Sequence, residues 1–147
     1  KPTLRHRHFT VWKDDKAVRS KADMLANLHS KAASVVDARG VGRFTGEEAE
    51  ARPELASGHI PGSRNLPFGQ LFNADGTWKR GDELNQAYAD AGVDLSKPMI
   101  TTCGSGMTAA VVLFGARMTG KTDVSLYDGS WSEWGLDKDT PKAQGAA

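Results

Sequence analysis

The chain has 147 residues, of which 39% are hydrophobic and 25% are charged, and its formal net charge is +1. This length and composition are typical of one globular domain, and the balanced charge gives no support for binding to nucleic acid or to a membrane surface. The sequence also has no apolar run long enough for a transmembrane helix. A single cysteine excludes an internal disulfide framework and is compatible with a reducing compartment, so our working hypothesis is a cytoplasmic protein.

Residues 1–8 are predicted to form a basic linker. They contain His6 and His8, but two histidines without a nearby cysteine or carboxylate are a weak ligand set, so no metal site is expected. Because the chain starts at Lys1 rather than at Met and has no signal-peptide pattern, we expect it to be a trimmed or dissected fragment.

Two elements are predicted next. Residues 9–12 form an apolar stretch that indicates a short strand, followed by a turn over residues 13–16. Apolar residues at helical spacing between about Ala17 and His29 predict an amphipathic helix. His29 is expected to cap this helix or to lie on its surface.

Residues 33–39 contain a β-branched run that predicts a buried strand and ends in Asp37 and Arg39. We expect these two side chains to pair with each other or with neighbouring loops. Residues 40–56 show no clean periodicity and include Arg43 and Arg52, so they are either a functional lid or a solvated insertion. A turn at 58–62, a short strand at 63–68, a turn at 73–76 and a helix at about 81–90 follow.

The most informative stretch is Met99 to Thr108, MITTCGSGMT. Its first four residues predict a buried parallel strand, and the only cysteine, Cys103, stands at the carboxyl end of that strand. Small residues and then a helix-forming run follow, so backbone N–H groups can surround the sulfur and favour its thiolate. Cys103 is therefore either a nucleophile, which we favour, or a buried structural thiol.

The remaining pattern completes a three-layer α/β domain with a mainly parallel sheet. A helix is predicted from about Ser105 to Met118 and a strand over residues 124–127. Asp37 and Arg39 should then lie at the same edge of the sheet as Cys103. Trp131 and Trp134 are expected to pack at the rim rather than to contact substrate. The domain is assigned to residues 9–137, and residues 138–147 are predicted to be a loose tail.

Four segments carry a resemblance to a known family, and we quote them as they stand: DARGVGRFTG at 37–46, GHIPGSRNLPF at 58–68, CGSGMT at 103–108 and YDGSWSEW at 127–134. Together they resemble the C-terminal catalytic rhodanese domain of 3-mercaptopyruvate sulfurtransferases. The GHIPG motif indicates only the rhodanese fold, whereas the loop at 103–108 is far more specific for the mercaptopyruvate branch. Met107 replaces the usual valine, which exchanges one apolar side chain for another.

The resemblance implies roles for several residues. Cys103 would attack the sulfur of 3-mercaptopyruvate, release pyruvate and carry a persulfide to thioredoxin, another thiol or cyanide. Ser105 would donate a proton or hydrogen bond to the leaving pyruvate, and Arg43 and Arg52 would bind the substrate carboxylate, although without the resemblance both would be interpreted as surface arginines. The persulfide would lie within the backbone of Gly104, Gly106, Met107 and Thr108. No metal and no organic cofactor are expected.

Proteins of this family are usually tandem repeats, and the resemblance implies a missing N-terminal rhodanese domain whose aspartate and histidine support the loop serine. We therefore expect this chain alone to be less active than the longer protein. Two alternatives stay open, namely a thiosulfate sulfurtransferase and a non-catalytic rhodanese module that carries sulfur or binds a partner. A cysteine phosphatase is disfavoured because Thr108-Ala109-Ala110 stands where a phosphate-binding arginine would be needed.

Overall fold

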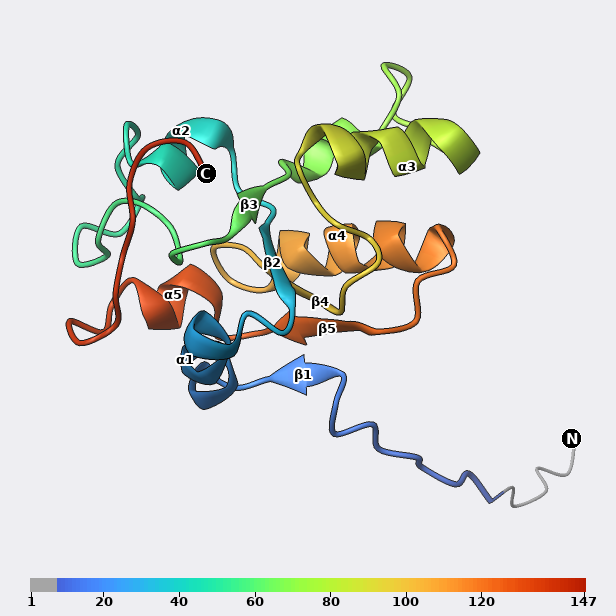
Figure 1. Ribbon diagram of the computed structural model, residues 1–147, viewed down its shortest axis with the longest axis horizontal. Coiled ribbons are helices and arrows are strands. Elements are labelled where there is room, and N and C mark those ends of the chain that lie inside the picture. The colour runs from blue at the N-terminus through green and yellow to red at the C-terminus, as the bar shows by residue number, and fades with distance from the viewer. Residues whose placement is uncertain (1–7) are drawn as a thin grey trace, which may run out of the picture.

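Five short strands pair in parallel, in the spatial order β1-β5-β4-β2-β3, in the computed structural model, which describes residues 8–147 (Figure 1). The strands are β1 (Val18–Arg19), β2 (Ser34–Asp37), β3 (Arg64–Asn65), β4 (Met99–Thr102) and β5 (Val124–Tyr127). The parallel sheet predicted from the sequence is thus confirmed. Residues 1–7 of the predicted linker, which include His6, lie outside the described residues.

Helices cover both faces of the sheet and complete the three layers. They are α1 (Lys21–Ser30), α2 (Val41–Thr45), the 3₁₀ helix η1 (Phe68–Leu71), α3 (Gly81–Asp90), α4 (Met107–Met118) and α5 (Ser130–Trp134). One core cluster contains residues of α3, α4 and η1, and the other contains Met24 of α1 with Trp131 and Trp134 of α5. Both tryptophans are therefore core residues, which is deeper than the predicted rim.

The central strands are the most buried part of the sheet and set the position of the cysteine. All four residues of β4 are buried, and Val36 and Asp37 of β2 lie opposite Thr101 and Thr102. The β-branched, apolar composition of these two runs suits strands that are covered on both faces. Because parallel strands end at one edge, Asp37, Arg39 and Cys103 emerge together there, as predicted.

The amino-terminal region differs from its prediction. Residues 9–12 form no strand, and Phe9 and Trp12 are 88% and 89% exposed, because the sheet edge beside β5 is occupied by β1 instead. The first helix begins at Lys21 rather than near Ala17. Ser20 fixes this start through a capping box in which Ser20 Oγ accepts from Asp23 N and Asp23 Oδ2 accepts from Ser20 N.

The carboxyl-terminal segment, 138–147, is largely exposed, but several of its residues are hydrogen-bonded to the rest of the domain. Ala143 pairs antiparallel with His59, and Trp134 donates its indole N–H to the carbonyl of Pro141 at 2.8 Å. Gly58 admits this segment, because a Cβ there would lie 2.2 Å from the carbonyl oxygen of Ala143. A tail of small residues can approach another backbone closely enough to hydrogen-bond with it.

Among the described residues, none of the helices is both long enough and apolar enough to span a bilayer.

Candidate active site

Cys103 directly follows β4 and lies at the amino end of α4, where its side chain is almost fully buried at 2% exposure. The N–H of Gly106 donates to Cys103 Sγ at 3.1 Å. Gly106 adopts φ +87°, and a Cβ there would lie 2.8 Å from Asp128 Oδ1. The turn that aims this N–H at the sulfur therefore requires glycine.

The segment that begins α5 holds the outside of the same loop. Trp131 N and Ser132 N donate to the carbonyls of Cys103 and Gly104, each at 2.9 Å, and Ser132 Oγ donates to Gly104 O at 2.6 Å. Ser130 Oγ accepts from Cys103 N at 3.2 Å. Because the loop carbonyls are bound from outside, the following N–H groups are free to face inward toward the sulfur.

Opposing effects act on the thiol. Burial raises the pKa of Cys103, but hydrogen bonds from the Thr108 hydroxyl and from the N–H groups of Ala109, Ser105 and Gly106 together lower that pKa below its ordinary value. The lowering prevails because these donors stabilise the thiolate more than the neutral thiol. The site therefore favours a buried thiolate.

The sulfur loop borders a cavity of about 300 Å³. The loop contributes Cys103, Gly104, Ser105, Met107 and Thr108 to its lining, and the segment after β2 contributes Arg43, Glu50 and Arg52. The structure thus brings every predicted site residue to one cavity except Gly106, which is buried behind the loop. Ser105 and Met107 are exposed at the rim, and Met107 is 78% exposed.

Three arginines line this cavity, and the two that the sequence predicted to bind substrate, Arg43 and Arg52, differ in setting. Arg43 is carried by α2, a short helix inside the segment that the sequence showed only as aperiodic, and its guanidinium pairs with the buried carboxylate of Glu50. That hydrogen bond raises the pKa of Arg43. Arg52 pairs at 2.6 Å with Glu54, and both of these side chains are about half exposed. Arg43 and Arg52 therefore each have a carboxylate partner, and of these two partners only that of Arg43 is buried.

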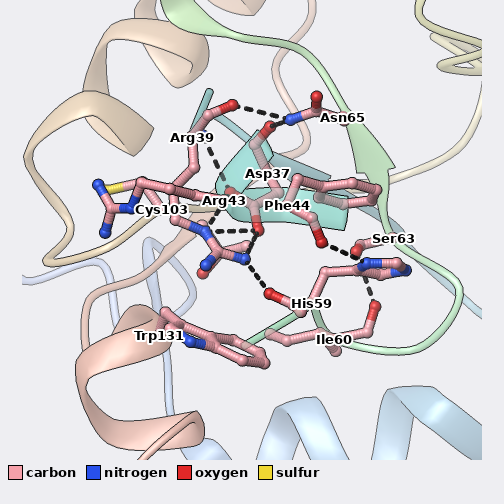
Figure 2. A network of polar contacts seen from close by, with 12 residues as sticks. Asp37, Arg39, Arg43, Phe44, His59, Ile60, Ser63, Asn65, Cys103 and Trp131 are labelled. Atoms are coloured by element: carbon pink, nitrogen blue, oxygen red, sulfur yellow. Dashed lines mark hydrogen bonds and ion pairs between the residues drawn. The ribbon is translucent and has the colours of Figure 1, made fainter. Parts of the chain in front are cut away.

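A buried ionic network adjoins the cavity and contributes Arg39 and Glu50 to its lining (Figure 2). Arg39 donates to both carboxylate oxygens of Asp37, to Glu50 Oε1 at 2.6 Å and to the carbonyl of Gly58 at 2.8 Å. Its guanidinium also lies 4.6 Å from the ring centroid of Trp131. The predicted pairing of Asp37 with Arg39 is confirmed, and the pair joins β2 to the loops around it.

Comparison with known proteins identifies this arrangement. Residues 20–137 match the model of the rhodanese-like domain. The chain belongs to this family. It is 44% identical over 126 residues to the 3-mercaptopyruvate sulfurtransferase of Mus musculus and 43% identical over 129 residues to the thiosulfate sulfurtransferase of Cricetulus griseus. These alignments cover 86% of the chain and 42% and 43% of the two relatives.

A solved structure gives the same result for the fold. The crystal structure of the Tum1 protein from Saccharomyces cerevisiae superposes with a TM-score of 0.80 at 35% identity, over 90% of this chain and 48% of that one. This rhodanese-like domain therefore spans less than half the length of these relatives.

Sequence reasoning missed three residues of this rhodanese-like site. Glu50 stands among several glutamates of one polar segment, and nothing local separates it from its neighbours, because its burial depends on arginines elsewhere. Ser130 and Ser132 fall within YDGSWSEW, which the sequence marked for its tryptophans. The positive φ of Ser130, +49°, is set by the contact with the sulfur loop and has no sequence signal of its own.

Histidine and metal chemistry have little structural support in the described part of the chain. His59 is buried, stacks on Phe44 with ring centroids 3.8 Å apart, and places Nδ1 2.8 Å from the Phe44 carbonyl oxygen. Within residues 8–147 there is no group of three or more His, Cys, Asp or Glu side chains that could hold a metal ion. The charged side chain that lies beside Gly104 of the sulfur loop is instead that of Arg43.

Proposed function

We propose that this rhodanese-like domain is a sulfurtransferase that takes sulfur from 3-mercaptopyruvate and passes it to a thiol acceptor. The observation that carries the proposal is a thiolate-favouring cysteine in the lining of a cavity that Arg43 and Arg52 also line. This pairs a sulfur nucleophile with cations suited to a small carboxylate. The relative from Mus musculus bears the name of this activity.

The first half-reaction uses both walls of the cavity. The Cys103 thiolate attacks the donor sulfur, so an S–S bond forms while the donor C–S bond breaks. The released electron pair leaves as the enolate of pyruvate and takes up a proton to give pyruvate. Ser105, at the rim of the cavity, is the candidate donor to that leaving group. The N–H groups that favour the thiolate then stabilise the persulfide anion.

The second half-reaction returns the cysteine to its starting state. An acceptor thiolate, such as that of thioredoxin or a small thiol, attacks the outer sulfur, and the Cys103 thiolate leaves. Cyanide can act in the same way. A free nucleophilic thiol needs reducing surroundings, which keeps the cytoplasm as our working location.

Thiosulfate is the second candidate donor, because a thiosulfate sulfurtransferase is nearly as similar to this chain as the mercaptopyruvate enzyme. Thiosulfate is a dianion and would need an excess of positive charge near the sulfur loop. The loop itself supplies no cationic side chain, and Arg43 and Arg52 each have a glutamate partner. The monoanionic donor fits this charge balance better.

The test measures sulfur transfer to a thiol acceptor from each donor, with Cys103→Ser as the control. We expect turnover with 3-mercaptopyruvate, much weaker turnover with thiosulfate, and none from the variant. Equal or higher turnover with thiosulfate would reverse the donor assignment, and turnover by the variant would remove Cys103 from the mechanism.

A further domain is the remaining partner that we propose, because the chain spans less than half of its relatives. Such a domain would cover the open side of the cavity and support Ser105. A longer form of the protein should therefore turn over faster than this chain. Equal rates for the two forms would contradict this partner role.

A further inference from the structure

Glu50 lies between two arginines, and each of its carboxylate oxygens contacts a different one. Oε1 accepts from Arg39 Nη1 at 2.6 Å, while Oε2 accepts from Arg43 Nε at 3.1 Å and also from Arg43 Nη2. The Glu50 side chain is only 2% exposed. A buried carboxylate whose oxygens are both bound by cations has little freedom to move.

The Arg39 side of this bridge is fixed to the sheet. Arg39 is held by Asp37 at the end of β2, by the Gly58 carbonyl and by the face of Trp131. Its side chain is 1% exposed. Because Arg39 cannot shift without breaking several buried contacts, Glu50 Oε2 is held at a set place beside the cavity.

The other arginine that binds Glu50, Arg43, lines the cavity that contains Cys103. The side chain of Arg43 is 34% exposed, and its bonds to Glu50 use Nε and one hydrogen of Nη2, which leaves other N–H groups for a ligand. Its Nη1, which makes no bond to Glu50, lies 4.0 Å from the point where a Cβ on Gly104 would stand, and Nη2 lies 3.2 Å from that point. The free part of the guanidinium is therefore beside the sulfur loop.

The charge of Glu50 gives no direct advantage to an anionic substrate. A carboxylate in the wall of a carboxylate-binding cavity repels the ligand, so a favourable contribution from Glu50 has to come from geometry. Arg43 is a long side chain with many rotamers, and fixing such a chain before binding lowers the entropy cost of binding.

We infer that Glu50 is a positioning residue that holds Arg43 beside the loop of Cys103, so that the guanidinium is in place to receive the carboxylate of an anionic substrate. The inference deepens the proposed function and rests on it. Glu50 touches no reacting atom and acts through Arg43.

Alkylation of Cys103 tests this role without any sulfur donor. Iodoacetate and iodoacetamide react in the same way, since the thiolate carbon–sulfur bond forms as iodide leaves, but only iodoacetate carries a carboxylate. The rate constant with iodoacetate divided by that with iodoacetamide measures how much the protein favours the reagent that carries a carboxylate. The rate constant with iodoacetamide alone reports the reactivity of the thiol itself. The full chain is compared as wild type, Glu50→Gln, Arg43→Gln and the double variant.

We expect Glu50→Gln to lower the iodoacetate-to-iodoacetamide ratio by about three-fold or more, as Arg43→Gln does, and to add nothing in the Arg43→Gln background, because residues that act through one contact are not additive. An unchanged or raised ratio would mean that Glu50 only neutralises charge, and would overturn the inference. So would an equal effect of Glu50→Gln with and without Arg43.

Two further variants separate positioning from general damage. Asp123→Asn removes a carboxylate from the ion pair with buried Lys121, which is remote from this cavity, and should leave the ratio unchanged. If Glu50→Gln fails to fold, Glu50→Asp keeps the charge but shortens the bridge, and it should also lower the ratio. If the ratios behave as expected and no sulfur transfer occurs, the positioning role stands and the donor assignment fails.

Discussion

The two walls of the cavity are built from different parts of the chain. The sulfur wall, residues 103–108, surrounds Cys103 mainly with backbone N–H groups, whereas the arginine wall, formed by Arg43, Glu50 and Arg52, consists of side chains held by ion pairs. Backbone N–H groups keep their positions when a side chain is exchanged, but they no longer point at the sulfur when the turn itself is altered. Ion-paired side chains can be exchanged singly, and each exchange has a graded effect.

The largest effect should come from Gly106→Ala, which breaks the sulfur wall through its backbone. The new Cβ would meet Asp128 at 2.8 Å and force an alanine into φ +87°. We expect persulfide formation to be lost and the free energy of unfolding to fall by about 1–3 kcal/mol. Intact mass after treatment with donor and thermal unfolding measure the two effects.

Gly62→Ala is the matched control for Gly106→Ala. Gly62 also has a positive φ, +78°, but a Cβ added there would meet no neighbouring atom within 4 Å, so the variant shares the backbone strain without the clash. It should lose stability and keep the reactivity of Cys103. Equal reactivity in both variants would show that the turn at Gly106 does not set up the thiolate.

Arg43→Gln should give the largest effect on the arginine wall. A hydrogen bond between charged groups contributes about 1.5–3 kcal/mol, so kcat/KM for 3-mercaptopyruvate should fall roughly 10- to 100-fold. The rate of Cys103 with neutral iodoacetamide should stay near that of the wild type. If both rates fell together, Arg43 would be acting on the sulfur wall rather than on the substrate.

The pH dependence of alkylation isolates the sulfur wall from the arginines. The reactive form is the thiolate, and hydrogen bonds lower the pKa of Cys103 despite its burial. The rate with iodoacetamide should therefore reach half its maximum below the pH of about 8.5 that is usual for a free cysteine, and fall as the pH drops through that lowered pKa. A urea-unfolded sample should return to the usual value, and a midpoint at or above it in the folded chain would contradict the thiolate.

Arg52→Gln should have the smallest effect. Arg52 and its partner Glu54 are about half exposed, and exposed ion pairs contribute only about 0–1 kcal/mol. We expect kcat/KM for 3-mercaptopyruvate to fall by about two- to five-fold, with unchanged stability. A loss as large as that of Arg43→Gln would show that Arg52 binds the substrate equally strongly and that burial of the partner glutamate does not distinguish the two.

The difference between the sulfur wall and the arginine wall also explains which parts of the site could be predicted from the sequence. The strand that ends at Cys103 and the helix after it follow from contiguous residues, and α3 was predicted at its observed bounds, Gly81–Asp90. Local signals of this kind lie within a few residues of one another. The sulfur wall could therefore be predicted almost completely.

The arginine wall and the chain ends depend on contacts between distant residues. Glu50 is buried only because Arg39 and Arg43 neutralise it, and Ala143 pairs with His59 only because Gly58 leaves room for its carbonyl. The apolar residues 9–12 suggested a strand, but a strand needs an open sheet edge, and β1 pairs with β5 there. Hydrophobic pattern alone carries no information about which edge is occupied.

The most direct test of persulfide formation at Cys103 is the intact mass of the chain after a single treatment with 3-mercaptopyruvate. The measurement needs only one turnover, so it is valid even if the chain works slowly without a further domain. We expect the wild-type protein to gain the mass of one sulfur atom and to lose it again when a thiol is added, while Cys103→Ser gains nothing. A folded wild-type chain whose thiol reacts with iodoacetamide but takes up no sulfur would contradict this prediction.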